Sequence, residues 1–375
     1  MAAPAAVTAA WRSWNGSARL AGVDLARALA VLGMLAAHLV EIDEPFHIGD
    51  PRTWIDVVNG RSSILFAVLA GVSIALVTGG ALPRRGPALA TARRRLAVRA
   101  ALLWAIGLGL ILTGVPVYVI LPAYAILFLL ALPLVALPPR VLWGVAASVI
   151  VVVPWLLPLW GASPVWDGVW GETLFLLVGW AYPFPLWIAF VLAGIAIGRA
   201  DLRRVDVQVS LLAGGAVAVV TAGMIDVVLA GSGALGGDGY LLAVWSSAPH
   251  SSGILEALGS TGFAAAVLGA CLLLCRTPAT WAVAPLRAVG SMPLTAYVGQ
   301  ILVWAVVAAL TMGDTGDLGG FREMQPFWWF VLGAVVFCTA WALLRGQGPI
   351  ERMLAAIARR VVPEKRWDAA DRVDT

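Results

Sequence analysis

Three ionisable side chains interrupt an apolar stretch that is otherwise long enough to cross a lipid bilayer. Asp24, Arg27 and His38 lie within residues 20–40, where most other residues are Ala, Leu, Val, Gly or Met. An Arg or Asp at the centre of a membrane-spanning helix costs about 2.5–3.5 kcal/mol on insertion scales, so such residues usually face protein or water. The three side chains are therefore candidates for a functional site.

The spacing of these residues indicates what chemistry they could perform. Arg27 and His38 are eleven residues apart, which brings them to nearly the same face of a helix, about 16 Å apart along its axis. A guanidinium can bind phosphate, and an imidazole can act as a general base near neutral pH. Asp24 lies three residues before Arg27, and these two charges could instead simply neutralise each other.

Composition excludes an ordinary soluble protein. Of the 375 residues, 61% are hydrophobic and 12% are charged, and the mean hydropathy is +0.91, whereas soluble domains carry about 25% charged residues. The net charge of +4 arises from arginines grouped in loops, which is typical of cytoplasmic loops rather than of nucleic-acid binding. The three cysteines lie in apolar runs with no disulfide or metal-ligand spacing, so no metal is expected.

Apolar runs of about twenty residues predict an all-α, polytopic integral membrane bundle with about ten transmembrane helices. Only Gly114 separates the third and fourth spans, and Pro122 and Tyr124 should interrupt the fourth. Pro183 and Pro185 should break the sixth into a short interfacial piece and a full span. The predicted spans cover residues 20–40, 62–79, 97–113, 115–137, 141–160, 174–198, 207–230, 254–275, 288–311 and 326–345.

Loop charge predicts how the bundle is oriented. Six arginines lie within residues 84–99, between the second and third spans, whereas five acidic residues lie within 41–56, after the first span. The positive-inside rule then places both termini in the cytoplasm of a multi-pass protein of the cell (inner or plasma) membrane. All three histidines, His38, His47 and His250, would lie at or beyond the outer membrane face.

This topology also defines the predicted parts of the chain. Residues 1–18 form a cytoplasmic tail and residues 19–345 form the transmembrane domain. Residues 346–375 form a second cytoplasmic tail that begins as an amphipathic helix, which we interpret as an anchor on the inner leaflet.

Four segments together resemble a known family of membrane acyltransferases. They are VDLARALAVLGMLAAH at 23–38, NGRSSILFAVLAGVSIAL at 59–76, PLRAVGSMPLTAYVGQ at 285–300 and GQGPIERML at 346–354. Their order along the chain, with the Arg-x10-His pattern on the first helix, resembles the heparan-alpha-glucosaminide N-acetyltransferase family and its bacterial YeiB-type relatives. The chain departs from the family at Ala28, where glycine usually follows the arginine.

The resemblance implies transfer of an acyl group, acetyl in the simplest case, from cytoplasmic acyl-CoA to an extracytoplasmic sugar, glycan or other small amine or hydroxyl acceptor. His38 is the leading general base. In the heparan branch, however, asparagine occupies that position and the active histidine lies further on, near His47 here. Arg27 would bind the phosphates of acyl-CoA, with Arg287 as a second contributor, and Asp24 would belong to the same site. Membrane lipids and a second copy of the chain are the other partners considered.

Further polar residues are candidates for binding the acceptor. His250 could contribute to function or only cap a loop. Several of the others could simply hydrogen-bond between helices, which is the commoner use of polar groups in a membrane. The candidate substrate-binding residues are Asn59, Arg61, His250, Glu256, Tyr297 and Gln300.

A transporter or flippase of a glycan or lipid precursor is the alternative function. The buried charges would then form a coupling site. Transporters often carry matching broken helices in two repeated halves. The predicted break at residues 180–185 has no counterpart in the other half of the sequence, which favours the acyltransferase.

Overall fold

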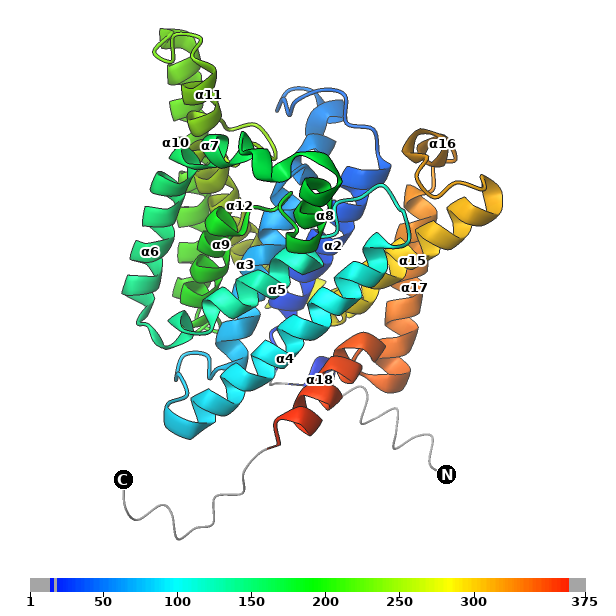
Figure 1. The fold of residues 1–375 in the computed structure, drawn as a ribbon. Helices are drawn as coiled ribbons and strands as arrows, with labels where there is room; N and C mark the ends of the chain where they lie inside the picture. Colours follow the sequence, from blue (N-terminus) through cyan, green and yellow to red (C-terminus); the bar gives the residue numbers. More distant parts are fainter. Residues whose placement is uncertain (1–13, 17–18, 364–375) are drawn as a thin grey trace, which may run out of the picture.

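The computed structural model describes residues 14–16 and 19–363, and every regular element in them is a helix (Figure 1). The predicted all-α fold is confirmed. Most of the predicted 1–18 tail and the end of the 346–375 tail lie outside the described residues. With η for a 3₁₀ helix, the elements are α2 Ala21–Leu39, η1 Pro51–Val58, α3 Arg61–Val77, α4 Gly86–Ile111, α5 Leu121–Ala131, η2 Leu134–Ala136, α6 Pro139–Val152, η3 Val153–Trp155, α7 Leu157–Gly161, η4 Pro164–Trp166, α8 Gly168–Val178, α9 Phe184–Gly198, α10 Val205–Ser232, α11 Gly239–Trp245, α12 Ile254–Leu274, α13 Ala279–Ala282, α14 Ala284–Ser291, α15 Pro293–Thr311, α16 Leu318–Glu323, α17 Phe327–Arg345 and α18 Pro349–Val361.

Five of these helices, α2, α10, α12, α15 and α17, are long and apolar enough to cross a membrane. Counting η1 and α3 as one bent span makes six, and shorter apolar helices include α5, α8 and α9. The protein is therefore a polytopic membrane protein. The count of ten spans stays a prediction, because several helices that match predicted spans are shorter than a bilayer requires.

Prolines set several helix boundaries differently from the prediction. Pro122 does not interrupt the fourth span but lies in the first turn of α5, which begins at Leu121. The first turn tolerates proline because its N–H would have no helical partner there. Similarly, the predicted span 288–311 is two helices, α14 and α15, that meet at Met292 just before Pro293.

The predicted break in the sixth span is confirmed. Helix α8 ends at Val178, the next residue Gly179 has a left-handed backbone with φ of 64°, and α9 begins only at Phe184. Glycine adopts this conformation without the steric cost that a Cβ would bring. A Cβ at Gly179 would also meet the backbone of Ala123, so this turn lies directly against the start of α5.

Helix α2 lies at the centre of the bundle and packs against α3, α12 and α14. Glycines allow the closest approaches: Gly290 of α14 lies against the backbone of Asp24, and Gly22 lies against the backbone of Leu272. Most of α2 is buried, whereas α10 and α17 expose most of their side chains at the edge of the bundle. A central helix surrounded by protein is the position in which a membrane protein can hold charged side chains.

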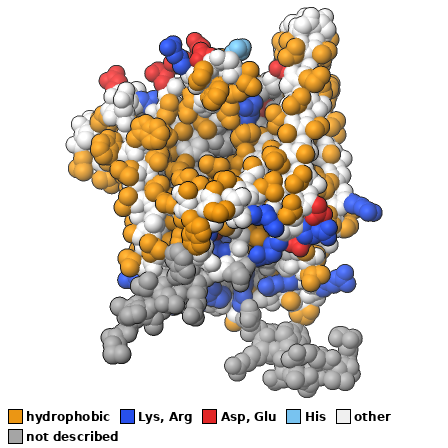
Figure 2. Space-filling view, turned by 180° about the vertical axis from the view of Figure 1, so that it is seen from behind, with side chains coloured by type: hydrophobic (Ala, Val, Ile, Leu, Met, Phe, Trp, Pro, Cys, Tyr) orange, Lys and Arg blue, Asp and Glu red, His pale blue; other side chains and the backbone are white. Residues whose placement is uncertain are grey.

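The two ends of the bundle differ in charge. Figure 2 shows acidic side chains and histidine at its upper rim, a mainly apolar band below, and a group of Arg side chains towards the lower end. Helix α18 lies at the lower end (Figure 1), where it packs against α4 and α15. Its Leu354, Ala355 and Ala358 are buried. The interpretation of this helix as a surface anchor is therefore incomplete, because one face belongs to the packed bundle.

Candidate functional site

The charged residues at the start of α2 form one connected cluster. The buried carboxylate of Asp24 accepts hydrogen bonds from Arg19 Nε at 2.9 Å and from Arg27 Nη1 at 3.1 Å. Arg27 Nη2 donates to Ser73 Oγ of α3 at 2.6 Å. The Asp24–Arg27 pair expected from the sequence is thus present, but Arg19 shares the same carboxylate. Two cations around one anion leave a net positive charge, which suits an anionic ligand.

Arg27 lies between two cavities of different character. The first, about 240 Å³, is mainly apolar and is lined by residues of α2, α3, α4, α5, α15 and α18, among them Phe66, Leu69 and Tyr124. The second, about 420 Å³, is more polar and is lined by Asp24, Arg19, Asp201 and Arg203 among others. A guanidinium at this boundary can bind an anionic group on one side while an apolar group lies on the other.

Sequence reasoning missed several residues of the apolar cavity. Besides Arg27, the cavity is lined by Ser73, Arg99 and Glu351. The Glu351 carboxylate accepts hydrogen bonds from the backbone N–H groups of Leu294 at 2.8 Å and Thr295 at 3.0 Å, and so caps the start of α15. Ser73 and Glu351 both occur in segments that carried the family resemblance. The resemblance could therefore have singled out these two residues, whereas their residue types alone gave no reason to choose them.

The structure places Arg287 away from both cavities. Its guanidinium donates to the Thr280 hydroxyl at 2.9 Å and to Asn15 Oδ1 at 2.6 Å, and lies 5.6 Å from the Trp14 ring centroid. Arg287 is only 4% exposed. These contacts join the segment before α2 to the region around α14.

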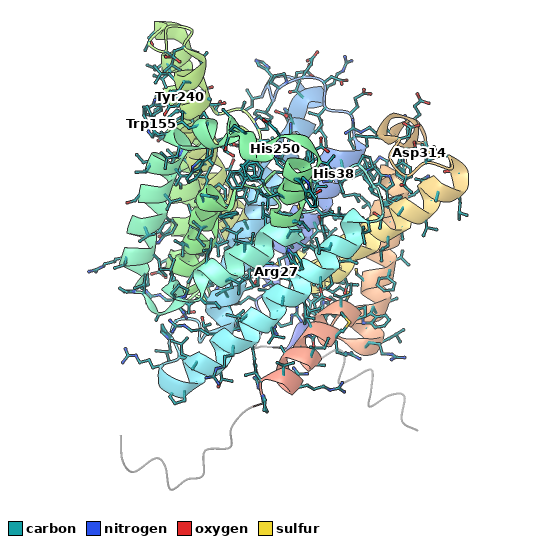
Figure 3. The ribbon with its side chains drawn as sticks, viewed as in Figure 1. Arg27, His38, Trp155, Tyr240, His250 and Asp314 are labelled. Carbon is teal, nitrogen blue, oxygen red and sulfur yellow. The ribbon has the colours of Figure 1, made fainter. Side chains whose placement is uncertain are left out.

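His38 lies at the other end of α2 from this cluster. Figure 3 shows His38 and His250 nearer the upper end of the bundle than Arg27. The His38 carbonyl accepts a hydrogen bond from Arg322 Nε of α16 at 2.9 Å. His250 and Arg322 are near enough to act on the half-buried His38 imidazole electrostatically. His38 and His250 thus both lie at this end of the bundle.

His250 belongs to a loop that Glu256 of α12 holds. Glu256 Oε1 accepts a hydrogen bond from the His250 N–H at 2.5 Å, and Oε2 accepts from the Ser252 N–H at 2.6 Å. The loops around His250 remove part of the water that would solvate its charged form, which lowers the pKa of the imidazole although the side chain still reaches the surface. Glu256, expected to bind substrate, here contacts the protein's own backbone.

His47 lies in the exposed loop that follows α2. Its N–H donates to the Thr53 hydroxyl at 2.7 Å, and its carbonyl accepts from the Asp50 N–H at 3.1 Å. Its imidazole lies near Gly49. The loop is therefore held through the backbone groups of His47, and the His47 imidazole is exposed.

The remaining predicted residues contact neighbouring groups of the protein. Asn59 Nδ2 donates to Asp56 Oδ1 at 3.1 Å, and the Arg61 guanidinium lies 5.9 Å from the Phe263 ring centroid. The Tyr297 hydroxyl accepts a hydrogen bond from the Ile120 N–H at 3.3 Å. Gln300 is 8% exposed and lines an apolar groove between α15 and α17. For Tyr297, the bond between elements considered from the sequence is present.

These features define a polytopic helical membrane protein with a cation-rich cluster beside an apolar cavity at one end of its central helix and histidines at the other. The family model described as heparan-alpha-glucosaminide N-acetyltransferase, catalytic, matches residues 19–224, and the chain belongs to this family. The family indicates an enzyme of the transferase type. A second family model, described as a protein of unknown function, DUF418, matches residues 216–360. No curated protein and no solved structure matches the chain.

The two matches agree with the resemblance found in the sequence. The family assignment, heparan-alpha-glucosaminide N-acetyltransferase-like and YeiB-type, is confirmed. The first match includes Arg27, His38 and His47, and the second includes His250 and Glu256. The two ends of α2 thus fall in the first match, and the loop beside His38 falls in the second.

Proposed function

We propose that the protein transfers an acyl group, acetyl in the simplest case, from cytoplasmic acyl-CoA to an extracytoplasmic sugar or glycan. The observation that supports this most directly is the position of Arg27 between a polar and an apolar cavity, with His38 further along the same helix. The phosphate groups of the donor need the polar environment, and its thioester-linked acyl group needs the apolar one. The enzyme would work as a multi-pass protein of the cell membrane.

The donor would bind at the Arg27 end of α2. Arg27 and Arg19 together carry more charge than Asp24 neutralises, so a phosphate there would gain charge-assisted hydrogen bonds. The acyl-bearing arm would lie in the apolar cavity beside Phe66 and Tyr124. Arg27 and His38 are about 16 Å apart along the helix. A donor that reaches both must carry its acyl group on a long arm, as acyl-CoA does.

The acceptor would react at the His38 end. His38 takes the proton of the acceptor amine or hydroxyl while the acceptor N or O forms a bond to the acyl carbon. The C–S bond of the thioester breaks, and the CoA thiolate leaves and takes the proton from the His38 imidazolium, which restores the base. His47 is the alternative base, because the exposed loop that carries it follows α2 directly. Asn59, Arg61, His250, Tyr297 and Gln300 are proposed to bind or orient the acceptor.

A direct assay separates this function from transport. We expect purified protein in lipid nanodiscs to convert labelled acetyl-CoA and a hexosamine acceptor into acetylated sugar and free CoA. In proteoliposomes, acetylated product should form when donor and acceptor are on opposite sides of the membrane. Movement of unmodified glycan across the membrane with no acylation would instead support the transporter and refute the acyltransferase.

The proposed sidedness predicts which surface residues an impermeant reagent can label. Leu82 and Ile48 are both strongly exposed, at 86% and 79%, and lie in the basic and acidic loops respectively. In intact cells, Ile48→Cys should react with an impermeant maleimide, whereas Leu82→Cys should react only after the membrane is opened. Labelling of Leu82→Cys in intact cells would overturn the assignment of donor and acceptor sides.

A further inference from the structure

The loop between α11 and α12 has an unusual backbone beside the candidate site. His250 and Ser252 have positive φ angles of 63° and 59°. Residues with a Cβ adopt this left-handed region only at an energetic cost, and such residues recur at functional sites. The loop must therefore be held by other interactions.

Glu256 supplies these interactions from the first turn of α12. Its carboxylate accepts three hydrogen bonds from the loop, from the N–H groups of His250 and Ser252 and from the Ser251 hydroxyl at 3.2 Å. Its own N–H donates to the Ser246 carbonyl at 3.0 Å, which fixes the start of the same loop. Glu256 is 7% exposed. The carboxylate is thus buried and surrounded by loop donors rather than open to a substrate.

The start of α3 lies against the same group. Gly60 has φ of 68°, and a Cβ on it would lie 3.3 Å from Glu256 Oε1 and 3.4 Å from the His250 nitrogen. Arg61, the next residue, acts favourably on the charged carboxylate. This contact joins the loop to the segment Asn59–Arg61, which is itself a candidate for acceptor binding.

We propose that Glu256 is a positioning residue for acceptor binding: by holding His250 and Ser252 in their left-handed conformation, it presents the His250 imidazole beside His38. The inference rests on the proposed function, because it assigns His250 to the acceptor that His38 deprotonates. His250 then orients the acceptor hydroxyl or amine towards His38. Glu256 itself does not touch the acceptor, since its oxygens are occupied by the loop.

The chemistry of the carboxylate explains why an amide should not replace it. A carboxylate offers two acceptor oxygens and can meet the His250 N–H with one and the Ser252 N–H with the other. In glutamine one oxygen becomes an NH2 group, a donor that would face another donor. Glu256→Gln therefore keeps the size of the side chain and removes its hold on one side of the loop.

The test uses the full-length protein and the acetyl-CoA and hexosamine assay. Glu256→Gln should lower kcat/KM for the acceptor about tenfold, the usual effect of losing a hydrogen bond to a charged group, while the Kd for acetyl-CoA stays unchanged. Hydrogen exchange at the amides of residues 250–252 should become faster. Glu172→Gln, which alters an exposed glutamate on α8, is the matched control and should change neither quantity.

A second substitution distinguishes positioning from direct catalysis. Glycine adopts the left-handed conformation without the cost that Ser252 bears, so Ser252→Gly added to Glu256→Gln should recover part of the lost kcat/KM. Failure of this recovery would mean that Glu256 acts on the substrate itself, and would overturn the proposal. Unchanged acceptor kinetics in Glu256→Gln despite faster exchange would also overturn it and leave the proposed function standing. Absence of transfer by the unsubstituted protein would refute the proposed function. Faster hydrogen exchange in Glu256→Gln would then show only that Glu256 holds the loop, and the role in acceptor binding would fall with the proposed function.

Discussion

The two ends of α2 are built in different ways. At the Arg27 end, side chains from packed helices meet directly: Asp24 joins Arg19 and Arg27, and Arg27 joins Ser73 of α3. At the His38 end, backbone groups and loops dominate. The His38 carbonyl accepts a bond from Arg322, and His250 is held through its backbone N–H.

This difference is consistent with separate roles for the two ends of α2, donor binding at the Arg27 end and acceptor chemistry at the His38 end. Helices packed through close glycine contacts, such as Gly290 on Asp24, leave little freedom to the groups between them. The proposed donor site, built there, would already be formed before the donor arrives. Loops vary more readily in sequence and conformation than the elements they connect, so a site built from loops can be adapted to a particular acceptor. We therefore expect substitutions at the two ends to separate donor binding from acceptor chemistry.

The largest effect should come from removing the His38 imidazole. His38→Ala should lower the rate of acyl transfer by about 10²–10⁴, the usual contribution of a positioned acid–base group. The Kd for acyl-CoA should stay the same, because Arg27 lies about 16 Å away along α2. Steady-state kinetics and equilibrium binding on one preparation measure both quantities.

His47→Ala is the necessary companion. If His47→Ala abolishes turnover while His38→Ala retains it, the base lies in the loop and His38 only neighbours it. Normal turnover by both variants would show that neither histidine is the base. Acceptor chemistry could then no longer be assigned to the His38 end of α2.

A smaller effect, confined to the donor, is expected at the opposite end. Arg27→Ala should raise the Kd for acyl-CoA about 10–100-fold through loss of charge-assisted phosphate contacts. The fold should persist because Arg19 still pairs with Asp24. Isothermal titration with a non-hydrolysable acyl-CoA analogue measures the change, and Arg52→Ala, at an exposed position of η1, is the matched control. Unchanged donor affinity together with a lower melting temperature would make the Arg27 cluster purely structural.

The smallest effect should come from Glu351, which acts on both packing and charge. Glu351→Ala removes the cap of α15 and should cost about 1 kcal/mol of stability, measured as a lower melting temperature. It also removes a negative charge that acts on Arg27, so the Kd for acyl-CoA should fall, by less than tenfold. Glu323→Ala, at an exposed position on α16, should change neither. A higher Kd in Glu351→Ala would instead place the Glu351 carboxylate among the groups that bind the donor.

Much of the helical framework could be predicted from the sequence. The predicted spans 20–40, 207–230, 254–275 and 326–345 agree with α2, α10, α12 and α17 to within about two residues at each end. The break before α9 was also predictable, because two prolines close together cannot continue a helix. The sequence could not show that Pro122 and Pro293 begin helices rather than interrupt them. A proline is compatible with either position, and neighbouring elements decide which one forms.

The residue types and spacing on α2 by themselves determined that Asp24, Arg27 and His38 interrupt one membrane-spanning helix, with Arg27 and His38 on nearly the same face. Hydropathy and helical period are properties of a single segment, so sequence suffices for them. Which groups meet depends on how the helices pack: Arg19 shares Asp24 with Arg27, Glu351 caps α15 beside the same cavity, and Glu256 holds the loop of His250. A hydrogen bond requires two groups within about 3 Å. Whether distant segments come that close depends on how whole helices pack, which no single segment encodes.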